Sequence, residues 1–175
     1  MYDGLFSQYY FALVYDEEEE YEDAIQALTE HLALNPSNPM AHNNRGAAYA
    51  EMGETERALA DFAEAMRLAP DDSRPAANRS WFFENMGQLP QALADLDLAV
   101  GIDPDVPHLR LARASIRWAL RDLTGALEDF NRGIELRPGS LKAHLDRAAL
   151  LDELGEPQKA QADREAAARL PSGSD

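Results

Sequence analysis

The residues best suited to chemistry in this chain are four histidines, a residue type that serves as an acid–base catalyst or as a metal ligand. No two of them are four residues apart, the spacing that places two side chains on one face of a helix. The chain also lacks the HExxH zinc motif, the GxSxG nucleophile motif and the phosphate-binding P-loop motif. We therefore predict that the protein is not an enzyme and holds neither a metal nor a cofactor. The histidines are His31, His42, His108 and His144.

Acidic residues are concentrated in one stretch, YDEEEEYEDA, residues 15–24, which contains seven carboxylates. Carboxylate oxygens are calcium ligands, so a calcium-binding loop is one interpretation of the run from Asp16 to Asp23. The run lacks the mid-loop glycine and the alternating ligands that a helix–loop–helix calcium site needs. We interpret it as an acidic surface rather than an ion site.

The charge of the whole chain restricts its partners. The 175 residues include 32 acidic and 16 basic ones, which give a net charge of −16. A chain this acidic repels the phosphates of nucleic acids and anionic membrane surfaces, so neither is expected as a partner. A basic protein or peptide is the electrostatically favoured partner.

Three absences bear on the location of the protein. The chain has no cysteine, so it forms no disulfide, and this leaves the redox compartment open. No apolar run approaches the ~20 residues of a membrane span. The first residues have neither the basic start nor the cleavage site of a secretory signal. A cytoplasmic protein is therefore expected.

The chain repeats itself every 34 residues. Proline closes similar tripeptides at Pro36, Pro70, Pro104 and Pro138, in steps of 34. Internal similarity at a fixed period of this size is typical of arrays built from one stacked structural unit. The period divides the chain into residues 5–38, 39–72, 73–106, 107–140 and 141–174.

Stacked in register, the five segments show columns of small residues at helical spacing. Glycine recurs between the two halves of a segment, at Gly53, Gly87 and Gly155, where a helix can end in a residue with positive φ. Each segment is therefore predicted to form two antiparallel helices of roughly 12–14 residues, the second of which ends at the proline. In this register the acidic run straddles the first turn between helices. The small-residue columns are Ala24, Ala58, Ala92, Ala126 and Ala160, and Ala12, Gly46, Ser80, Ala114 and Ala148.

The pattern resembles the tetratricopeptide repeat, in the NRG variant found in bacteria. The best match is Gly46-Tyr49-Ala58-Phe62-Pro70, within NRGAAYAEMGETERALADFAEAMRLAP. The resemblance implies an all-α fold, a right-handed superhelical α-solenoid of five repeats that forms a single domain over residues 1–175. Three arginines depart from the pattern. Arg117 replaces an aromatic residue, Arg121 replaces the turn glycine, and Arg164 replaces a bulky apolar residue in a terminal helix that we interpret as the solvated cap.

Arginine and aspartate form two further columns, sixteen residues apart. Both are missing from the first repeat, which suggests that they pair with each other. We interpret these charges as part of the scaffold, in ion pairs that link the two helices of one repeat or neighbouring repeats. The columns are Arg45, Arg79, Arg113 and Arg147, and Asp61, Asp95, Asp129 and Asp163.

The resemblance also implies that the first helix of each repeat lines a concave groove that binds an extended peptide. In relatives, asparagines at the place of Asn44 and Asn78 bond the peptide backbone, although NRG is also a plain scaffold variant. Trp81 and Trp118 are candidate hot spots, with packing against an adjacent helix as the alternative for Trp118. The candidate groove residues are Tyr9, Asn43, Asn44, Arg74, Asn78, Trp81, His108 and Trp118.

Two classes of function follow from these features. The leading one is a non-catalytic adaptor that binds a basic, extended peptide or protein segment, with Glu17, Glu18, Glu19 and Glu20 as an acidic rim. The alternative is a structural scaffold that self-associates through the bulky residues of its N-terminal edge, which no preceding helix covers. Some relatives bind the acidic C-terminal tail of a chaperone through a carboxylate clamp of Lys, Asn and Arg side chains. Such binding is disfavoured here, because Tyr9 and Leu13 occupy the positions of the Lys and Asn in the first repeat.

Overall fold

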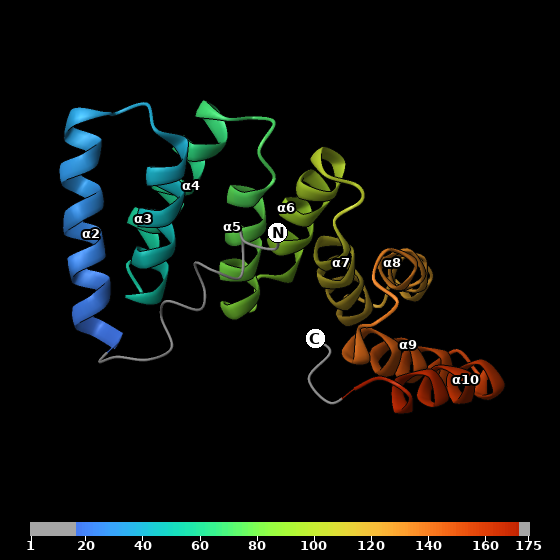
Figure 1. The fold of residues 1–175 in the computed structure, drawn as a ribbon. Coiled ribbons are helices and arrows are strands. Elements are labelled where there is room, and N and C mark those ends of the chain that lie inside the picture. Colours follow the sequence, from blue (N-terminus) through green and yellow to red (C-terminus); the bar gives the residue numbers. More distant parts are fainter. Residues whose placement is uncertain (1–16, 172–175) are drawn as a thin grey trace. The chain divides into compact units, whose positions relative to one another are not determined.

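The computed structural model describes residues 17–171 of the chain, with side chains from residue 20 onward. Within this range every regular element is an α-helix, which confirms the all-α prediction (Figure 1). The handedness of the array and the number of repeats stay predictions. The helices are α2 (Glu17–Leu34), α3 (Pro39–Glu51), α4 (Thr55–Leu68), α5 (Arg74–Asn85), α6 (Leu89–Ile102), α7 (Pro107–Ala119), α8 (Leu123–Leu136), α9 (Leu141–Glu153) and α10 (Pro157–Ala168).

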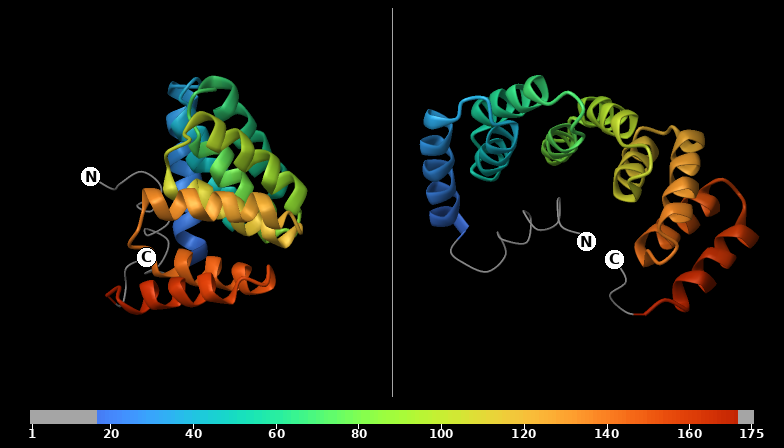
Figure 2. Two further views of the ribbon diagram at one scale, coloured as in Figure 1. Left: turned by 90° about the vertical axis from the view of Figure 1, so that its right-hand side faces the viewer. Right: turned by 45° about the horizontal axis from the view of Figure 1, so that its top comes forward.

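The chain divides into two compact units, Met1–Phe82 and Phe83–Asp175, which we describe separately. In unit 1, α2 packs on α3, and α3 packs on α4. In unit 2, helices α6 to α10 pack one on the next in chain order. The hairpins α3–α4, α7–α8 and α9–α10 can be followed in Figures 1 and 2. The single domain over residues 1–175 stays a prediction.

Alanine lets the paired helices approach closely. Ala58, Ala92, Ala126 and Ala160 are all fully buried, as the small-residue column predicts. Large side chains complete the clusters around them: Phe62 packs with Ala58 in unit 1, and Phe130 packs with Ala126 in unit 2. Burying an aromatic side chain removes roughly 150–250 Å² from water, so these phenylalanines are the main apolar contribution to each hairpin.

The turns between the paired helices need a residue with positive φ. Gly53, Gly87 and Gly155 have φ values of +72°, +70° and +76°, which confirms the role predicted for them. Arg121 occupies the same place in the fourth repeat and has a φ of +69°. A side chain at such φ costs on the order of 1 kcal/mol because its Cβ crowds the following carbonyl oxygen. The fourth turn is therefore strained where the other three are not.

Replacing Arg121 by glycine is expected to stabilise the protein. The stability of Arg121→Gly is compared with that of Arg121→Ala. Both variants lose the ion pair between Arg121 and Glu153, but only glycine relieves the strain. Arg121→Gly should be more stable than Arg121→Ala by about 1 kcal/mol, or about 2–4 °C in Tm. Thermal unfolding followed by circular dichroism measures the difference. Equal Tm values for the two variants would show that the turn stores no strain.

One prediction about local structure was wrong. The acidic run was expected to straddle the first turn between helices, but Glu17, Glu18, Glu19 and Glu20 form the first turn of α2. Glutamate is a good helix former, and position 19 lacks the glycine that ends the helix in other repeats. Carboxylates in a first turn also interact favourably with the helix dipole. As a result, α2 has 18 residues, against 12–14 in the other helices.

The arginine and aspartate columns pair as predicted wherever both partners lie in one unit. The guanidinium group of Arg45 donates to both carboxylate oxygens of Asp61, at 2.7 and 2.9 Å. Arg113 with Asp129 and Arg147 with Asp163 repeat this geometry at 2.6–2.8 Å. The hydrogen bond to Asp129 raises the pKa of Arg113 and outweighs the lowering effect of burial. These pairs join the two helices of a repeat; the fourth predicted pair spans the two units and stays a prediction.

The third nitrogen of each of these arginines bonds the residue sixteen positions earlier, on the preceding helix. The acceptors are Thr29 for Arg45, Asp97 for Arg113 and Asn131 for Arg147, at distances of 2.8–3.1 Å. One guanidinium group therefore joins three consecutive helices. The planar fork of arginine makes this arrangement achievable, and lysine could not reproduce it.

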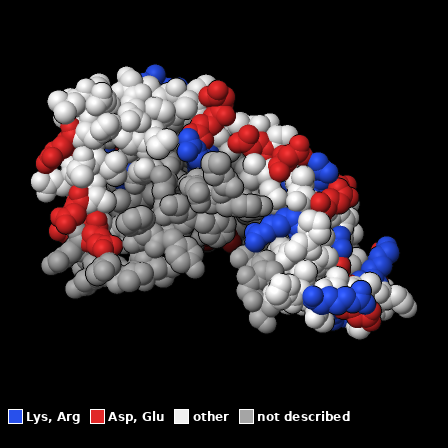
Figure 3. Space-filling model, viewed as in Figure 1, with Lys and Arg blue, Asp and Glu red and all other residues white. Residues whose placement is uncertain are grey.

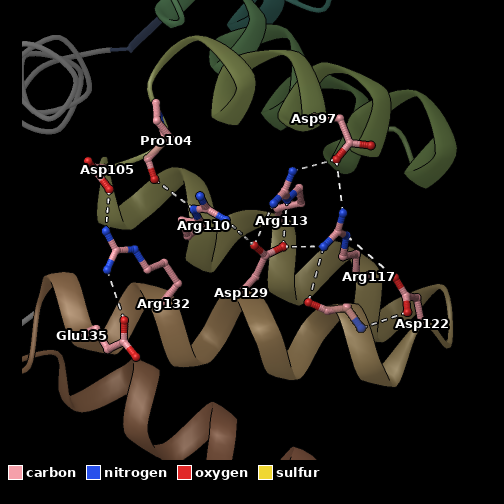
Figure 4. A network of polar contacts seen from close by, with 11 residues as sticks. Asp97, Pro104, Asp105, Arg110, Arg113, Arg117, Asp122, Asp129, Arg132 and Glu135 are labelled. Carbon is pink, nitrogen blue, oxygen red and sulfur yellow. Dashed lines mark hydrogen bonds and ion pairs between the residues drawn. The ribbon is translucent and has the colours of Figure 1, made fainter.

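Around Asp129 the pairing grows into a network (Figure 4). Besides Arg113, Arg117 donates to Asp129 at 2.9 Å and Arg110 donates to it at 3.3 Å. The carboxylate is 1 % exposed, so its charge depends on these three donors rather than on water. Arg117, which departs from the repeat pattern, is thus placed in the network that holds α6, α7 and α8 together.

Candidate peptide-binding faces

In unit 1, three predicted asparagines form one hydrogen-bonded chain across α3 and α5. The side-chain nitrogen of Asn78 donates to the side-chain oxygen of Asn43 at 3.0 Å. The side-chain nitrogen of Asn43 in turn donates to the side-chain oxygen of Asn44 at 3.2 Å. Asn43 and Asn78 are buried, with 5 % and 8 % exposure, whereas Asn44 is half-buried. The structure thus brings the three residues together, but it presents only Asn44 at the surface.

The amide chain ends in an unused donor. Both hydrogen atoms of the Asn44 side-chain nitrogen lack an acceptor among residues 17–171 of the structure, since the only bond of this side chain is the one that its oxygen accepts. The bond from Asn43, which is itself bonded by Asn78, orients this amide. A donor held in place in this way can bind a carbonyl oxygen of a peptide with little loss of side-chain entropy.

The surroundings of Asn44 are both apolar and charged. Met40, one helical turn before Asn44 on α3, is 47 % exposed. Trp81 is half-buried and packs against the cluster of Ala58, Phe62 and Phe82, so part of its ring belongs to the core. The guanidinium group of Arg74 bonds Asp72 through two nitrogens, at 2.6–3.1 Å. Burial raises the pKa of Asp72, but the side-chain and backbone hydrogen bonds from Arg74 together lower it below the ordinary value.

In unit 2, the predicted residues are His108 and Trp118, both on α7. Trp118 stands edge-on against Phe130, with ring centroids 6.4 Å apart, and its indole nitrogen donates to Glu153 at 2.7 Å. The packing alternative raised for this tryptophan is therefore the arrangement that the structure shows. It is half-buried, and its hydrogen bond leaves little of its polar edge for a ligand.

His108 lies in the first turn of α7 and is half-buried. Burial and the nearby charge of Arg137 lower its pKa below the ordinary 6.5, so its imidazole is neutral at pH 7. Its Nε2 atom is buried and has no hydrogen-bond partner within residues 17–171. The two other histidines that share a column, His42 and His144, each contact an aspartate, Asp61 and Asp163, as parts of the scaffold.

Two exposed apolar residues on the predicted lining were not chosen from the sequence as site residues. They are Met40 in unit 1 and Leu145 in unit 2, which are 47 % and 45 % exposed. Their signal in the sequence is an apolar side chain in a column that is otherwise polar or variable. Apolar side chains that remain exposed on a helix face are candidate contacts for a ligand.

The acidic rim lies on α2, and only part of it can be placed. Glu20 is half-buried, and Glu22, Asp23 and Glu30 of the same helix are exposed. Figure 3 shows acidic side chains along this edge of unit 1. Tyr9 and the aromatic N-terminal edge lie outside the described residues, as do the side chains of Glu17, Glu18 and Glu19, so self-association through that edge stays a prediction.

Within the described part of the chain, no group of three or more His, Asp or Glu side chains is arranged to hold a metal ion. None of the helices between residues 17 and 171 combines the length and the apolar character needed to cross a membrane.

Models of protein families match the chain along most of its length. A model described as TPR repeat matches residues 12–53. Models described as tetratricopeptide repeat match residues 39–72, 83–140 and 111–174. No curated protein matches the chain.

Solved structures of MamA are similar to most of the chain. A crystal structure of MamA has a TM-score of 0.77 at 15% identity and covers 89% of this chain and 95% of that chain. MamA from residue 41 to its end, from Desulfovibrio magneticus RS-1, has a TM-score of 0.75 at 19% identity, with 89% and 86% covered. The MamA RS-1 ArsTM double mutant has a TM-score of 0.76 at 18% identity, with 85% and 83% covered. At such identities the likeness shows the fold, a helical solenoid of this repeat type.

Proposed function

Because the chain belongs to the tetratricopeptide repeat family, we propose that it is a non-catalytic protein-interaction module whose first helices bind an extended, basic segment of a partner protein. The fold and the family support a role in protein interaction. The basic character of the partner and the residues that bind it are the new parts of the proposal.

The oriented amide of Asn44 is the observation that carries the proposal. An extended peptide exposes a backbone carbonyl oxygen at every residue, and each one needs a donor once the peptide leaves water. Asn44 offers that donor from the middle of α3, and it is oriented by the bond from Asn43, which Asn78 in turn bonds. The sequence suggested that both Asn44 and Asn78 bond the peptide backbone. We now assign this role to Asn44 alone, because Asn78 is buried and bonded within the protein.

The neighbouring side chains suit a segment with alternating character. Met40 supplies an exposed apolar contact on the same helix face, and the outer part of Trp81 supplies another on α5. In an extended peptide successive side chains point to opposite sides, so one set can contact these residues while the other meets solvent. Apolar contacts contribute affinity, and the amide fixes the position of the backbone.

The charge of unit 1 favours a basic segment. Residues 1–82 include sixteen acidic and five basic side chains, which makes this unit strongly anionic. Such a field accelerates association with a cationic partner at low ionic strength and is screened as salt rises. Affinity for a basic segment should therefore fall when the salt concentration increases.

The test compares the natural chain with Asn44→Ala. A fluorescein-labelled library of extended peptides of equal length, with basic, neutral and acidic members, is titrated and followed by fluorescence anisotropy. Basic members should bind best, and Asn44→Ala should weaken their binding about five- to tenfold, which corresponds to the loss of one hydrogen bond. Asn85→Ala, which changes an exposed asparagine outside the lining columns, is the matched control and should bind normally.

Equal binding by Asn44→Ala and Asn85→Ala would remove Asn44 from the site. Equal affinity for basic and acidic peptides, or an affinity independent of salt, would contradict the proposed charge of the partner.

A further inference from the structure

Unit 2 contains an open pocket of about 300 Å³. Its lining includes none of the residues of the binding faces discussed above. It lies among α8, α9 and α10. Its apolar part consists of Leu127, Leu151 and Ala162, and polar side chains surround that part. The complete lining is Leu127, Asn131, Arg147, Leu151, Lys159, Ala162 and Asp163.

The repeat period shows what occupies the same place elsewhere in the chain. Each lining residue has an equivalent 102 residues earlier, three repeats of 34, among α2, α3 and α4 of unit 1. There the equivalent of Leu151 is Tyr49, an aromatic residue. In the order of the pocket lining, the equivalents are Ile25, Thr29, Arg45, Tyr49, Arg57, Ala60 and Asp61.

Two cations lie over the ring of Tyr49. The guanidinium carbon of Arg45 is 5.9 Å from the ring centroid, and that of Arg57 is 5.5 Å from it. Cations within about 6 Å of an aromatic ring are attracted by its negative face. The equivalents of these two arginines in the pocket are Arg147 and Lys159, so both cations are kept while the aromatic ring that they contact in unit 1 is absent.

One repeat before the pocket, the chain occupies this place in a different way. The equivalent of Leu151 there is Arg117, whose guanidinium group bonds Asp129 at 2.9 Å and Asp97 at 3.4 Å. Leu151 instead is 4 % exposed and packs on Ala148 and Ala160, with Leu127 against the same cluster. Its aliphatic side chain belongs to the core, carries no ring and lines the pocket.

We propose that this pocket binds an aromatic side chain, tyrosine or phenylalanine, presented by a segment of a partner protein. The ring would lie on Leu127, Leu151 and Ala162, with Arg147 and Lys159 beside its faces, as Arg45 and Arg57 lie beside Tyr49. Charge complementarity selects the ring, because two cations attract its negative faces and have no such attraction for an aliphatic side chain. The two cations differ in burial and partners: Arg147 is bonded to Asp163 and Asn131, whereas Lys159 pairs with Glu156 and its side chain is 71% exposed.

This surface is independent of the first-helix faces proposed above. It contains none of their residues, and its test uses a different probe and different variants. The probe is N-acetyl-tyrosinamide, titrated into the intact ¹⁵N-labelled chain and followed by NMR, with N-acetyl-leucinamide as the aliphatic control. We expect saturable shifts at the amides of Leu151, Lys159 and Ala162 with the tyrosine probe, and markedly smaller shifts with the leucine probe.

Two variants make the test decisive. Leu151→Tyr places a ring of the protein's own in the pocket, so it should abolish the shifts caused by the tyrosine probe. Leu154→Tyr, an exposed position next to the same helix, is the matched control and should leave them unchanged. Lys159→Gln changes an exposed side chain and should weaken binding of the probe about two- to fivefold, the effect of one exposed cation on a ring.

The proposal is overturned if the leucine probe causes the same shifts as the tyrosine probe, because the pocket would then be a general apolar site. It is also overturned if Lys159→Gln binds the probe as well as the natural chain, since that variant retains the fold even if Leu151→Tyr does not. Loss of peptide binding in Asn44→Ala does not affect this result, so the two proposals fail separately.

Discussion

Replacing Asp129 by alanine is expected to destabilise unit 2 by about 3–5 kcal/mol. The carboxylate is 1 % exposed and accepts hydrogen bonds from Arg110, Arg113 and Arg117. Its removal leaves three guanidinium groups close together without the buried charge that they share; only the half-exposed Asp97 still pairs with Arg113 and Arg117. Breaking a buried ion pair by removing one partner costs this much because the remaining charge is neither solvated nor paired.

Asp97→Ala is the matched control for this prediction. Asp97 accepts from two of the same arginines, Arg113 and Arg117, but its side chain is 49% exposed. Water can replace it, so the loss should stay below about 1 kcal/mol. Urea unfolding of the two variants gives both free energies. A loss of less than 1 kcal/mol in Asp129→Ala would show that the network contributes little to stability.

Replacing Phe62 or Phe130 by alanine is expected to cost about 3–5 kcal/mol in the unit that contains it. The two phenylalanines occupy the same column, are 1 % and 0 % exposed, and pack on Ala58 and Ala126. Removing either ring loses its transfer free energy and leaves a cavity. Neighbouring residues fill such a cavity only in part, because the helices are held by their own hydrogen bonds.

Each unit contains its own fluorescent probe for this experiment. Trp81 packs on the cluster of Phe62, and Trp118 stands edge-on against Phe130. In a Trp118→Phe background, emission therefore reports unit 1, and in a Trp81→Phe background it reports unit 2. We expect Phe62→Ala to lower the urea midpoint of Trp81 emission more than that of Trp118, and Phe130→Ala to do the opposite.

The same data test the single domain predicted over residues 1–175. Two tryptophan midpoints that separate in the variants indicate units that unfold separately, as nearest-neighbour coupling in a repeat array allows. Midpoints that shift together in every variant would contradict the expected separation and support one cooperative domain.

Features that recur with the period could be predicted from the sequence. The buried alanines, the three glycines with positive φ and the pairing of Arg45 with Asp61 all depend on positions within one repeat. The same residue type recurs at the same position in several repeats, so the column predicts the local structure even when one repeat has a different residue there. Arg121 shows the strength of the pattern, because the backbone there adopts the positive φ of the glycine that it replaces.

The candidate site was predicted less completely, because exposure differs between members of one column. Asn44 and Asn78 share a column, yet only Asn44 presents its amide at the surface. The difference arises from the bond between Asn78 and Asn43, residues 35 positions apart on different repeats. Similarly, the bond from Trp118 to Glu153 joins side chains 35 positions apart, and it directs this tryptophan to the scaffold.

The sequence by itself determined the helical repeat, its turns and the acidic charge of the protein, because these depend on periodicity and composition. Only the tertiary structure decided which side chains remain available to a partner. Asn44, whose amide nitrogen has no acceptor among the described residues, and the pocket beside Leu151 both result from how side chains of neighbouring helices fill space. A repeat pattern indicates which type of residue occupies a position. Whether that side chain is exposed to a partner depends on every side chain that packs around it.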